Sequence, residues 1–238
     1  MNAELSHVPE TRFGVWFLST ETWVFHVLER AVADLKRLIG DHHSSYPVIV
    51  DVGCGSGQSF RLLRDLFSPQ RLIGVDVNPE MLALSATEVA RHNLAVTFLQ
   101  GESSHLPLAD ESVDMVFCHQ TFHHLVDQEN AIREFYRVLK PGGQMLFAES
   151  TRAYIHSWII RLLFRHPMDV QKSGPEYLAL IRGAGFHVPE TAVSYPYLWW
   201  SRKDLGVLER FCSIKPSPDR EETLLNLVAT KPPYPQAT

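Results

Sequence analysis

The positions of apolar and polar residues from residue 48 onward follow two periods in turn. Short runs of β-branched and apolar residues, such as VIVDV at 48–52, alternate with longer stretches in which apolar side chains recur every three or four residues. The short runs predict buried strands and the longer stretches predict helices, so the alternation indicates a mostly parallel sheet with helices on both faces. The predicted strands are Val48–Val52, Arg71–Val75, Val96–Gln100, Val113–Cys118, Gln144–Glu149, His187–Tyr195 and Thr223–Thr230.

Residue types at the ends of the predicted helices support their placement. Asn78 is a favourable N-cap, Pro79 suits the first helical turn, and the sequence KPGG at 140–143 is expected to end a helix. These elements together predict an α/β fold on a seven-stranded, mostly parallel sheet. The predicted helices between the strands are Ser59–Phe67, Pro79–His92, Gln128–Val138 and Glu176–Ala184.

Several segments fall outside this alternation. Residues Thr22 to Ile39 repeat apolar side chains at helical spacing, so residues 1–46 are predicted to form a helical N-terminal cap or lid. Residues 47–232 are then expected to form the main domain, followed by a tail at 233–238. Insertions on the substrate side of this domain are predicted at about 151–175 and 196–220.

The composition narrows the classes of function. The chain has 238 residues, 45% hydrophobic content and a formal net charge of -5, which suits one domain and disfavours nucleic acid as a partner. Cys54, Cys118 and Cys212 form no CxxC pair or His-rich cluster, which favours a reducing cytoplasm and predicts no metal site. The N-terminus lacks the pattern of a secretory signal, and no apolar stretch approaches the roughly 20 residues that span a bilayer. We therefore expect a cytoplasmic monomer or homodimer without a transmembrane segment.

A glycine-rich turn follows the first predicted strand, in VIVDVGCGSG at 48–57. Glycine lets the backbone turn sharply from strand to helix and lets a ligand lie against it. Asp51 at the strand end can receive a charged amino group, and Asp76 at the end of the second strand can accept both hydroxyl hydrogens of a ribose. The G-x-G-x-G spacing of 53–57 differs from the G-x-G-x-x-G of dinucleotide sites, which tilts the choice away from a nicotinamide cofactor.

Four stretches between residues 48 and 149 follow one another in order: DVGCGSG, VDVNPEML, GESSHLPLADESVDMVFC and HQTFHHLVDQENAIREFYRVLKPGGQMLFAE. They resemble, respectively, the glycine motif, the ribose-binding strand end, the third and fourth strands and the pocket-closing stretch of class I S-adenosylmethionine-dependent methyltransferases, particularly the small-molecule branch. The resemblance implies a Rossmann-like fold and S-adenosyl-L-methionine as cofactor, with S-adenosyl-L-homocysteine as product. It also places Glu102 where the family commonly has Asp beside the adenine. The expected cofactor-binding residues are Asp51, Gly53, Cys54, Gly55, Gly57, Asp76, Val77, Met81, Gly101, Glu102, Ser103, His119, Gln120 and His124.

The residues after the fourth predicted strand are candidates for proton transfer. Methyl transfer from a sulfonium requires alignment of donor and acceptor, and sometimes a base that removes a proton. His119 and His123 are the candidate catalytic bases, since histidine titrates near neutrality and strand ends face the ligand crevice. His124 is expected to contact the cofactor or to shape the loop.

Aromatic residues gather in three segments outside the resemblance: WFLSTETWVF, YIHSWIIRLLFRH and YPYLWW. We predict that these segments bind a hydrophobic or aromatic small-molecule acceptor. The alternatives are that they cover the sheet, that they form a dimer interface, or that Arg161, Arg165 and His166 make peripheral contact with a membrane. The expected substrate-binding residues are Phe13, Trp16, Phe17, Tyr154, Trp158, Tyr195 and Trp199.

The leading functional prediction is a methyltransferase that acts on oxygen or carbon of a small molecule. Within the same class, the alternative is N-methylation of an amine or lipid headgroup. A different class is a protein that binds the cofactor without methyl transfer. A nicotinamide oxidoreductase is disfavoured by the spacing of the glycine turn.

Overall fold

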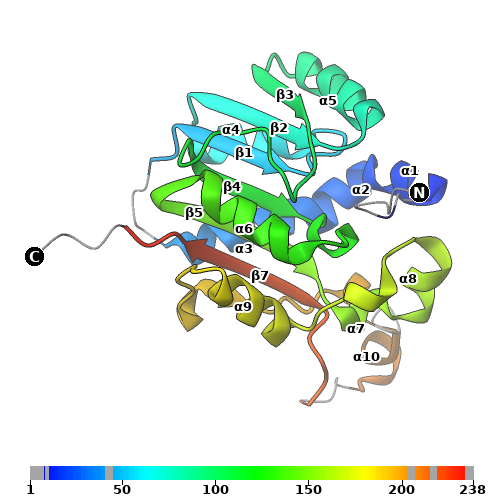
Figure 1. Ribbon diagram of the computed structural model, residues 1–238. Helices are drawn as coiled ribbons and strands as arrows, with labels where there is room; N and C mark the ends of the chain where they lie inside the picture. The colour runs from blue at the N-terminus through cyan, green and yellow to red at the C-terminus, as the bar shows by residue number, and fades with distance from the viewer. Residues whose placement is uncertain (1–7, 9–10, 41–44, 203–206, 215–218, 234–238) are drawn as a thin grey trace, which may run out of the picture.

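Seven strands in the described part of the chain form one sheet in the order β3-β2-β1-β4-β5-β7-β6 (Figure 1). The computed structural model describes residues 8, 11–40, 45–202, 207–214 and 219–233. The five strands β1 to β5 pair in parallel with their neighbours in the sheet, whereas β7 runs antiparallel to both β5 and β6. This confirms the predicted mostly parallel sheet. The strands are β1 Val48–Val52, β2 Arg71–Asp76, β3 Val96–Gln100, β4 Val113–His119, β5 Leu139–Ser150, β6 Val193–Ser194 and β7 Leu224–Thr230.

Helices precede the sheet, connect its strands and follow β5. The predicted caps are present, since the Asn78 side chain accepts from the backbone N–H of Glu80 and Pro79 occupies the first turn of α5. The α-helices are α1 Arg12–Leu18, α2 Glu21–Trp23, α3 Glu29–Ile39, α4 Ser59–Phe67, α5 Pro79–Arg91, α6 Gln128–Val138, α7 Arg152–Ile155, α8 Trp158–Leu163, α9 Gly174–Gly183 and α10 Val207–Cys212. A π-helical segment, η1 Val24–Leu28, joins α2 to α3, and the 3₁₀ turns are η2 Phe122–His124, η3 Met168–Val170, η4 Glu190–Ala192 and η5 Trp199–Ser201.

The two faces of the sheet are covered by different helices. Successive side chains of a strand point to opposite faces, so Ile49 of β1 packs with α3 and α4, and its neighbour Val50 packs with α6 and α9. Leu35 of α3 is fully buried against the sheet. Part of the segment predicted as an N-terminal cap therefore belongs to the layer that covers the sheet.

Two predicted strands differ most from the structure in where they begin. The predicted strand His187–Tyr195 is paired as a strand only at Val193–Ser194, because Pro189 and the turn η4 interrupt it, although His187 still bridges to Thr230. The helix α6 ends at Val138 as predicted, but β5 begins at Leu139 and not at Gln144, so residues 140–143 lie in this strand, next to an irregularity in the pairing of β4 and β5. Of the predicted cap and tail, residues 1–7, 9–10, 41–44 and 234–238 lie outside the described residues.

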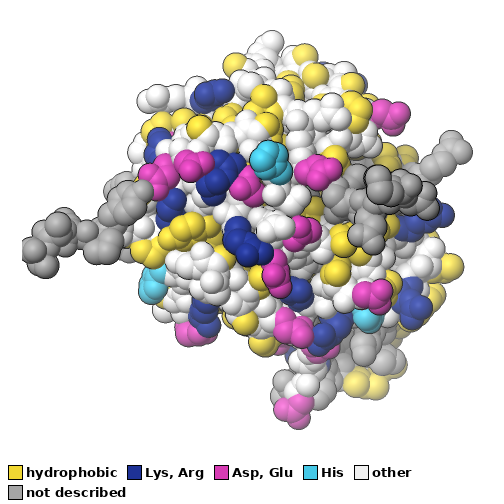
Figure 2. Space-filling model, in the orientation of Figure 1, with side chains coloured by type: hydrophobic (Ala, Val, Ile, Leu, Met, Phe, Trp, Pro, Cys, Tyr) yellow, Lys and Arg dark blue, Asp and Glu magenta, His cyan; other side chains and the backbone are white. Residues whose placement is uncertain are grey.

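The surface seen in Figure 2 carries both signs of charge. Acidic and basic side chains are interspersed on this face. Ion pairs among the described residues include Arg137 with Asp110 at 2.6 Å and Lys231 with Glu111 at 3.2 Å. Alternating signs do not build the extended positive field that attracts a polyanion. None of the described helices is both long and apolar enough to pass through a bilayer.

Candidate active site

A pocket of about 910 Å³ opens at the carboxyl ends of β1 to β4. The sheet order places β1 between β2 and β4, so the direction of strand succession reverses beside β1, where ligands of open α/β sheets bind. The lining includes Val8, Val15, Trp16, Leu18, Ser19, Trp23, Leu28, Asp51, Gly53, Cys54, Gly55, Ser56, Gln58, Ser59, Val75, Asp76, Val77, Asn78, Glu80, Met81, Leu84, Thr87, Glu88, Arg91, Gly101, Glu102, Ser103, Ser104, Phe117, His119, Gln120, Thr121, His124, Leu125 and Asp127.

The glycine turn forms the floor of this pocket. The backbone at Gly53 has φ of 74° and at Gly55 φ of 50°, a region that favours glycine. A Cβ on Gly53 would lie 2.1 Å from Cγ2 of Thr121, so a larger residue would push the β1 and β4 loops apart. A Cβ on Gly55 would meet nothing within 4 Å. Gly55 thus presents bare backbone to open space in the pocket, where a ligand can approach closely.

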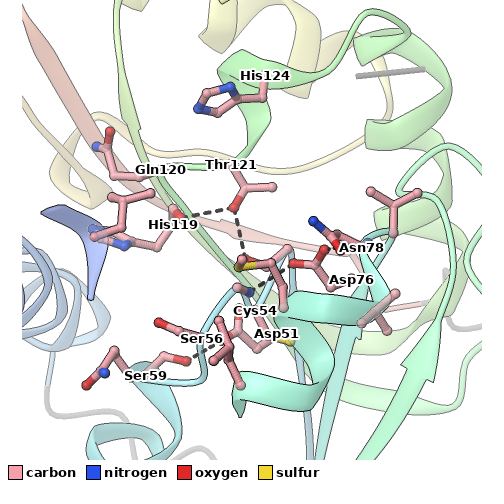
Figure 3. A pocket seen from close by; sticks show the side chains of 18 of the residues that line it. Asp51, Cys54, Ser56, Ser59, Asp76, Asn78, His119, Gln120, Thr121 and His124 are labelled. Carbon is pink, nitrogen blue, oxygen red and sulfur yellow. Dashed lines mark hydrogen bonds between the residues drawn. The ribbon is translucent and has the colours of Figure 1, made fainter. Parts of the chain in front are cut away.

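Asp76 is fixed by the turn that it faces. Its Oδ2 accepts from the backbone N–H of Gly55 and its Oδ1 accepts from that of Asn78, both at 2.9 Å (Figure 3). These two bonds orient the carboxylate beside the glycine turn. The carboxylate is therefore held in place before a ligand binds.

Asp51 lies at the end of β1 and is only 3% exposed. Ser59 at the start of α4 donates from Oγ to Oδ2 of Asp51 (Figure 3). Burial raises the pKa of Asp51 to about 7, the Ser59 hydrogen bond partly opposes this, and the negative charge of Asp76 adds to it. A positively charged ligand group at this carboxylate would relieve both the burial penalty and the repulsion from Asp76.

The end of β4 contributes polar side chains across the pocket from Asp51 (Figure 3). Gln120 has φ of 52° and accepts from Oγ of Ser150 at 2.7 Å. Nε2 of His119 is buried and has no hydrogen-bond partner among the described residues, while its ring lies edge-on to Trp23 at 5.4 Å. Burial lowers the pKa of His119 to about 3, and the neighbouring His123 is a smaller cause of the same shift. His119 is thus a neutral imidazole at physiological pH.

His123 lies behind the pocket wall and is not among the lining residues. Its Nδ1 lies 2.6 Å from Oε2 of the fully buried Glu149, whose Oε1 accepts from the backbone N–H groups of Thr121 and Phe122 at 2.8 Å. Glu149 therefore holds the loop after β4 in shape. This position does not favour His123 as a base that meets an acceptor in the pocket.

Most of the expected cofactor-binding residues line the pocket. The exception is Gly57, where a Cβ would lie 2.2 Å from Oγ of Ser85, so this glycine is needed for packing beneath the turn. Cys54 lines the pocket as a thiol, because burial raises its pKa above the usual range. Sequence reasoning missed the lining residues Ser59 and Thr121, although both stand within a few residues of a predicted strand end.

The expected substrate-binding residues are spread over several places. Trp16 lines the pocket, and the others are not among its lining residues. Phe13 and Phe17 of α1 pack on Phe164, Tyr154 packs on Trp200, Tyr195 lies against Gly174, Trp199 lies near His26, and Trp158 is 69% exposed on α8. Val15, Leu18 and Trp23 also line the pocket with apolar side chains and were not predicted individually. The helical spacing of the N-terminal segment alone does not show which of its side chains point toward the pocket.

Known proteins resemble this chain in both sequence and structure. A family model described as a methyltransferase domain matches residues 50–147. The demethylmenaquinone methyltransferase of Deinococcus radiodurans is 28% identical over 153 residues, which cover 62% of this chain and 61% of that protein. A methyltransferase solved in complex with the Haloferax volcanii Trm112 methyltransferase activator has a TM-score of 0.66 at 24% identity and covers 94% of this chain and 95% of its own. A Haemonchus contortus phosphoethanolamine N-methyltransferase, solved with phosphomonomethylethanolamine and S-adenosylhomocysteine, has a TM-score of 0.65 at 21% identity and covers 92% of this chain and 57% of its own.

The extent of these matches differs between sequence and structure. The chain spans 61%, 54% and 48% of the lengths of three curated relatives that it matches. The solved structures cover nearly the whole chain but share less than a quarter of its residues, so they show the common fold. The matched range 50–147 contains the glycine turn, Asp76 and the end of β4, whereas Trp16 and Trp23 lie before it.

Proposed function

We propose that this chain, which matches a methyltransferase-domain model over residues 50–147, is a class I S-adenosylmethionine-dependent methyltransferase that transfers a methyl group to a small hydrophobic or aromatic acceptor. The observation that carries the proposal is a continuous pocket with two unlike halves. One half contains the bare backbone of Gly55 between two fixed carboxylates, and the other is walled by apolar side chains of the N-terminal helices.

The residues of the first half fit S-adenosyl-L-methionine. Asp51 would receive the ammonium group, Asp76 would accept from the ribose hydroxyls, and Gly55 would let the ligand lie on the backbone. Glu102 also lines the pocket and would reach the adenine amino group. When bound, the cofactor supplies a methyl group on an electrophilic sulfonium. The residues named here bind and orient it.

The second half favours an apolar acceptor. Val15, Trp16, Leu18 and Trp23 approach the pocket from α1, α2 and the turn between them, and Phe117 of β4 completes the wall. The cation found among the described lining residues, Arg91, belongs to α5 and pairs with Glu88 at 3.2 Å. Such a wall suits a flat or aliphatic acceptor and offers little to a phosphate group.

His119 would orient the acceptor. His119 lines the pocket, and its buried Nε2 lacks a partner among the described residues, so an acceptor hydroxyl that reaches this nitrogen would satisfy it. With a pKa lowered to about 3, the imidazole binds a proton weakly at neutral pH. We therefore assign His119 to hydrogen bonding and alignment in place of the expected role of general base.

Calorimetric titration and an acceptor screen test this function. Purified protein should bind S-adenosyl-L-methionine and S-adenosyl-L-homocysteine, and mass spectrometry should show an acceptor that gains one methyl group. The screen should contain phenols, quinols, carbon acids and amines, since an amine product would favour the N-methyltransferase alternative. Binding without any product would support the alternative of a cofactor-binding protein, and tight binding of NADH alone would refute the proposal.

A matched pair of tryptophans tests the acceptor wall. Trp16 and Trp158 are 60% and 69% exposed, but only the former lines the pocket. Trp16→Ala should raise the KM for the acceptor about tenfold, because burying a large apolar side chain against a ligand contributes about 1.5–3 kcal/mol. Trp158→Ala should leave KM unchanged, and both variants should keep the affinity for S-adenosyl-L-methionine. Equal effects of the two substitutions on KM would contradict the assignment.

A further inference from the structure

Three histidine side chains that are far apart in the sequence meet beside the pocket. His123 and His124 belong to η2 after β4, and His166 lies between α8 and η3. One ring nitrogen of each lies within 4.8 Å of those of the other two. The ring centroids are 4.4 Å apart for His123 and His124, 5.1 Å for His123 and His166, and 4.7 Å for His124 and His166.

His123 is already oriented for binding through one nitrogen. Its Nδ1 is 2.6 Å from Oε2 of Glu149, and the other oxygen of this carboxylate is held by two backbone N–H groups. When Nδ1–H donates to the carboxylate, Nε2 keeps the lone pair. A buried carboxylate behind a histidine is the arrangement that fixes the tautomer of metal-binding imidazoles and raises their basicity.

The segment that carries His166 is tied to the same loop. The buried side chain of Gln171 donates from Nε2 to the backbone oxygen of His123 at 2.7 Å and to that of Pro167 at 2.9 Å. These two bonds hold the residue after His166 next to the loop of His123. The three imidazoles are therefore brought together by contacts that do not depend on an ion, as expected of a pre-organised site.

We propose that His123, His124 and His166 bind a divalent transition-metal ion of the zinc class. Imidazole suits Zn²⁺, Cu²⁺, Fe²⁺ and Ni²⁺. A Zn–N distance of about 2.0–2.1 Å in tetrahedral geometry places ligand nitrogens roughly 3.3 Å apart, which rotations of these side chains can reach. The sequence predicted no metal site, because His166 lies far along the chain from the other two histidines.

The site adjoins the candidate active site. His124 also lines the pocket, on the side away from Asp51 (Figure 3). Three protein ligands leave a fourth position for water or for an oxygen of a ligand. The ion would also clamp the loop after β4 to the segment after α8. The proposal concerns metal binding alone and does not rest on methyl transfer.

Metal content and spectroscopy of the full chain test this proposal. The protein is stripped with a chelator and dialysed against Co²⁺ or Zn²⁺, and its metal content is then measured by mass spectrometry. The wild type should take up one equivalent of Co²⁺ with visible d–d bands, and X-ray absorption of the Zn²⁺ form should show imidazole nitrogen ligands. Retention of less than about 0.1 equivalent, or a spectrum without imidazole scattering, would overturn the proposal irrespective of any variant.

Variants separate metal binding from simple packing of three imidazole rings. His166→Ala should weaken Co²⁺ binding at least tenfold, whereas His156→Ala, an exposed histidine at the end of α7, should bind as the wild type does. Glu149→Gln should weaken binding by about 10–100-fold, the usual effect of losing a partner behind a ligand histidine. The new amide would donate to Nδ1 and place the proton on Nε2. Equal Co²⁺ affinities of wild type and His166→Ala would refute the assignment, and circular dichroism checks that each variant is folded.

Discussion

Asp51→Asn separates the electrostatic and the binding roles of the carboxylate at the end of β1. The pKa of Asp51 is raised from 3.8 to about 7, mainly by burial. A carboxyl group whose pKa is raised on folding stabilises the folded state fully below its unfolded pKa, and this stabilisation is lost as pH rises toward the folded pKa. Asparagine resembles the protonated form, stays neutral at every pH and keeps an oxygen for the Ser59 hydroxyl.

The expected size of the effect follows from the shift. Each pKa unit corresponds to about 1.4 kcal/mol, so two units between pH 5 and pH 7 correspond to about 3 kcal/mol. In the absence of cofactor, Asp51→Asn should therefore gain about 3 kcal/mol in unfolding free energy relative to the wild type when the pH is raised from 5 to 8. Other titrating groups cancel in the difference between the two proteins. The assay is urea unfolding of both proteins at the two pH values.

Cofactor binding should show the opposite consequence of the same substitution. In the wild type, an ammonium group that pairs with Asp51 must displace a proton when the pH is below 7. The Kd of S-adenosyl-L-methionine should therefore rise by up to about tenfold for each pH unit below 7 and stay level above pH 7. Asp51→Asn should bind S-adenosyl-L-methionine about 10–100-fold more weakly at pH 8, with little dependence on pH, because it lacks the charge-assisted hydrogen bond.

The unfolding experiment can refute the reasoning. If the difference in unfolding free energy between Asp51→Asn and the wild type changes by less than about 1 kcal/mol between pH 5 and pH 8, Asp51 is ionised throughout and the reasoning fails.

Three further substitutions, with Gly142→Ala as a control, test the turn, the ribose site and the loop after β4. Gly55→Ala and Gly142→Ala both place a side chain at positive φ with no atom within 4 Å, so each should lose about 1–2 kcal/mol of unfolding free energy. Calorimetry should find cofactor affinity lowered more than tenfold only in Gly55→Ala, and equal affinities would contradict open ligand space at Gly55. Asp76→Asn should raise the Kd of S-adenosyl-L-methionine by about 10–100-fold, and near-normal affinity would argue against ribose binding. Glu149→Ala should lower the urea-unfolding free energy by about 3–5 kcal/mol, since it strips a buried carboxylate from two backbone N–H groups and a histidine, and a loss under 1 kcal/mol would show that water replaces it.

The first half of the pocket could be predicted from the sequence because its determinants are local. Asp51 and Asp76 each stand at the end of a strand that the apolar pattern delimits, and parallel pairing brings those ends to one edge of the sheet. The strand β6 could not be placed in the same way, since the apolar residues after His187 are shared between a 3₁₀ turn and a short strand. Local pattern also could not show that Trp23 contacts His119, because this contact depends on how a helix crosses the sheet.

The acceptor half depends on contacts between distant segments, and this explains why it was predicted less well. Trp16 and Trp158 have similar surroundings in sequence, each within an aromatic amphipathic stretch, yet only one of them faces the pocket. The helical spacing limits which side chains share a face, but it does not say which face meets the sheet edge.

The two halves of the pocket come from different parts of the sequence, and this bears on how acceptor choice can change among similar proteins. The matched range 50–147 holds the residues expected to bind the cofactor, whereas Trp16, Trp23 and His166 lie outside it. Substitutions on α1 and α2 can therefore reshape the proposed acceptor wall without moving Asp51 or Asp76, whose positions are set by strand pairing and by the turn. The similar proteins reported above bear the names of a demethylmenaquinone methyltransferase and a phosphoethanolamine N-methyltransferase. For this chain, the proposed division of the pocket predicts that acceptor KM and cofactor Kd will respond to separate sets of residues.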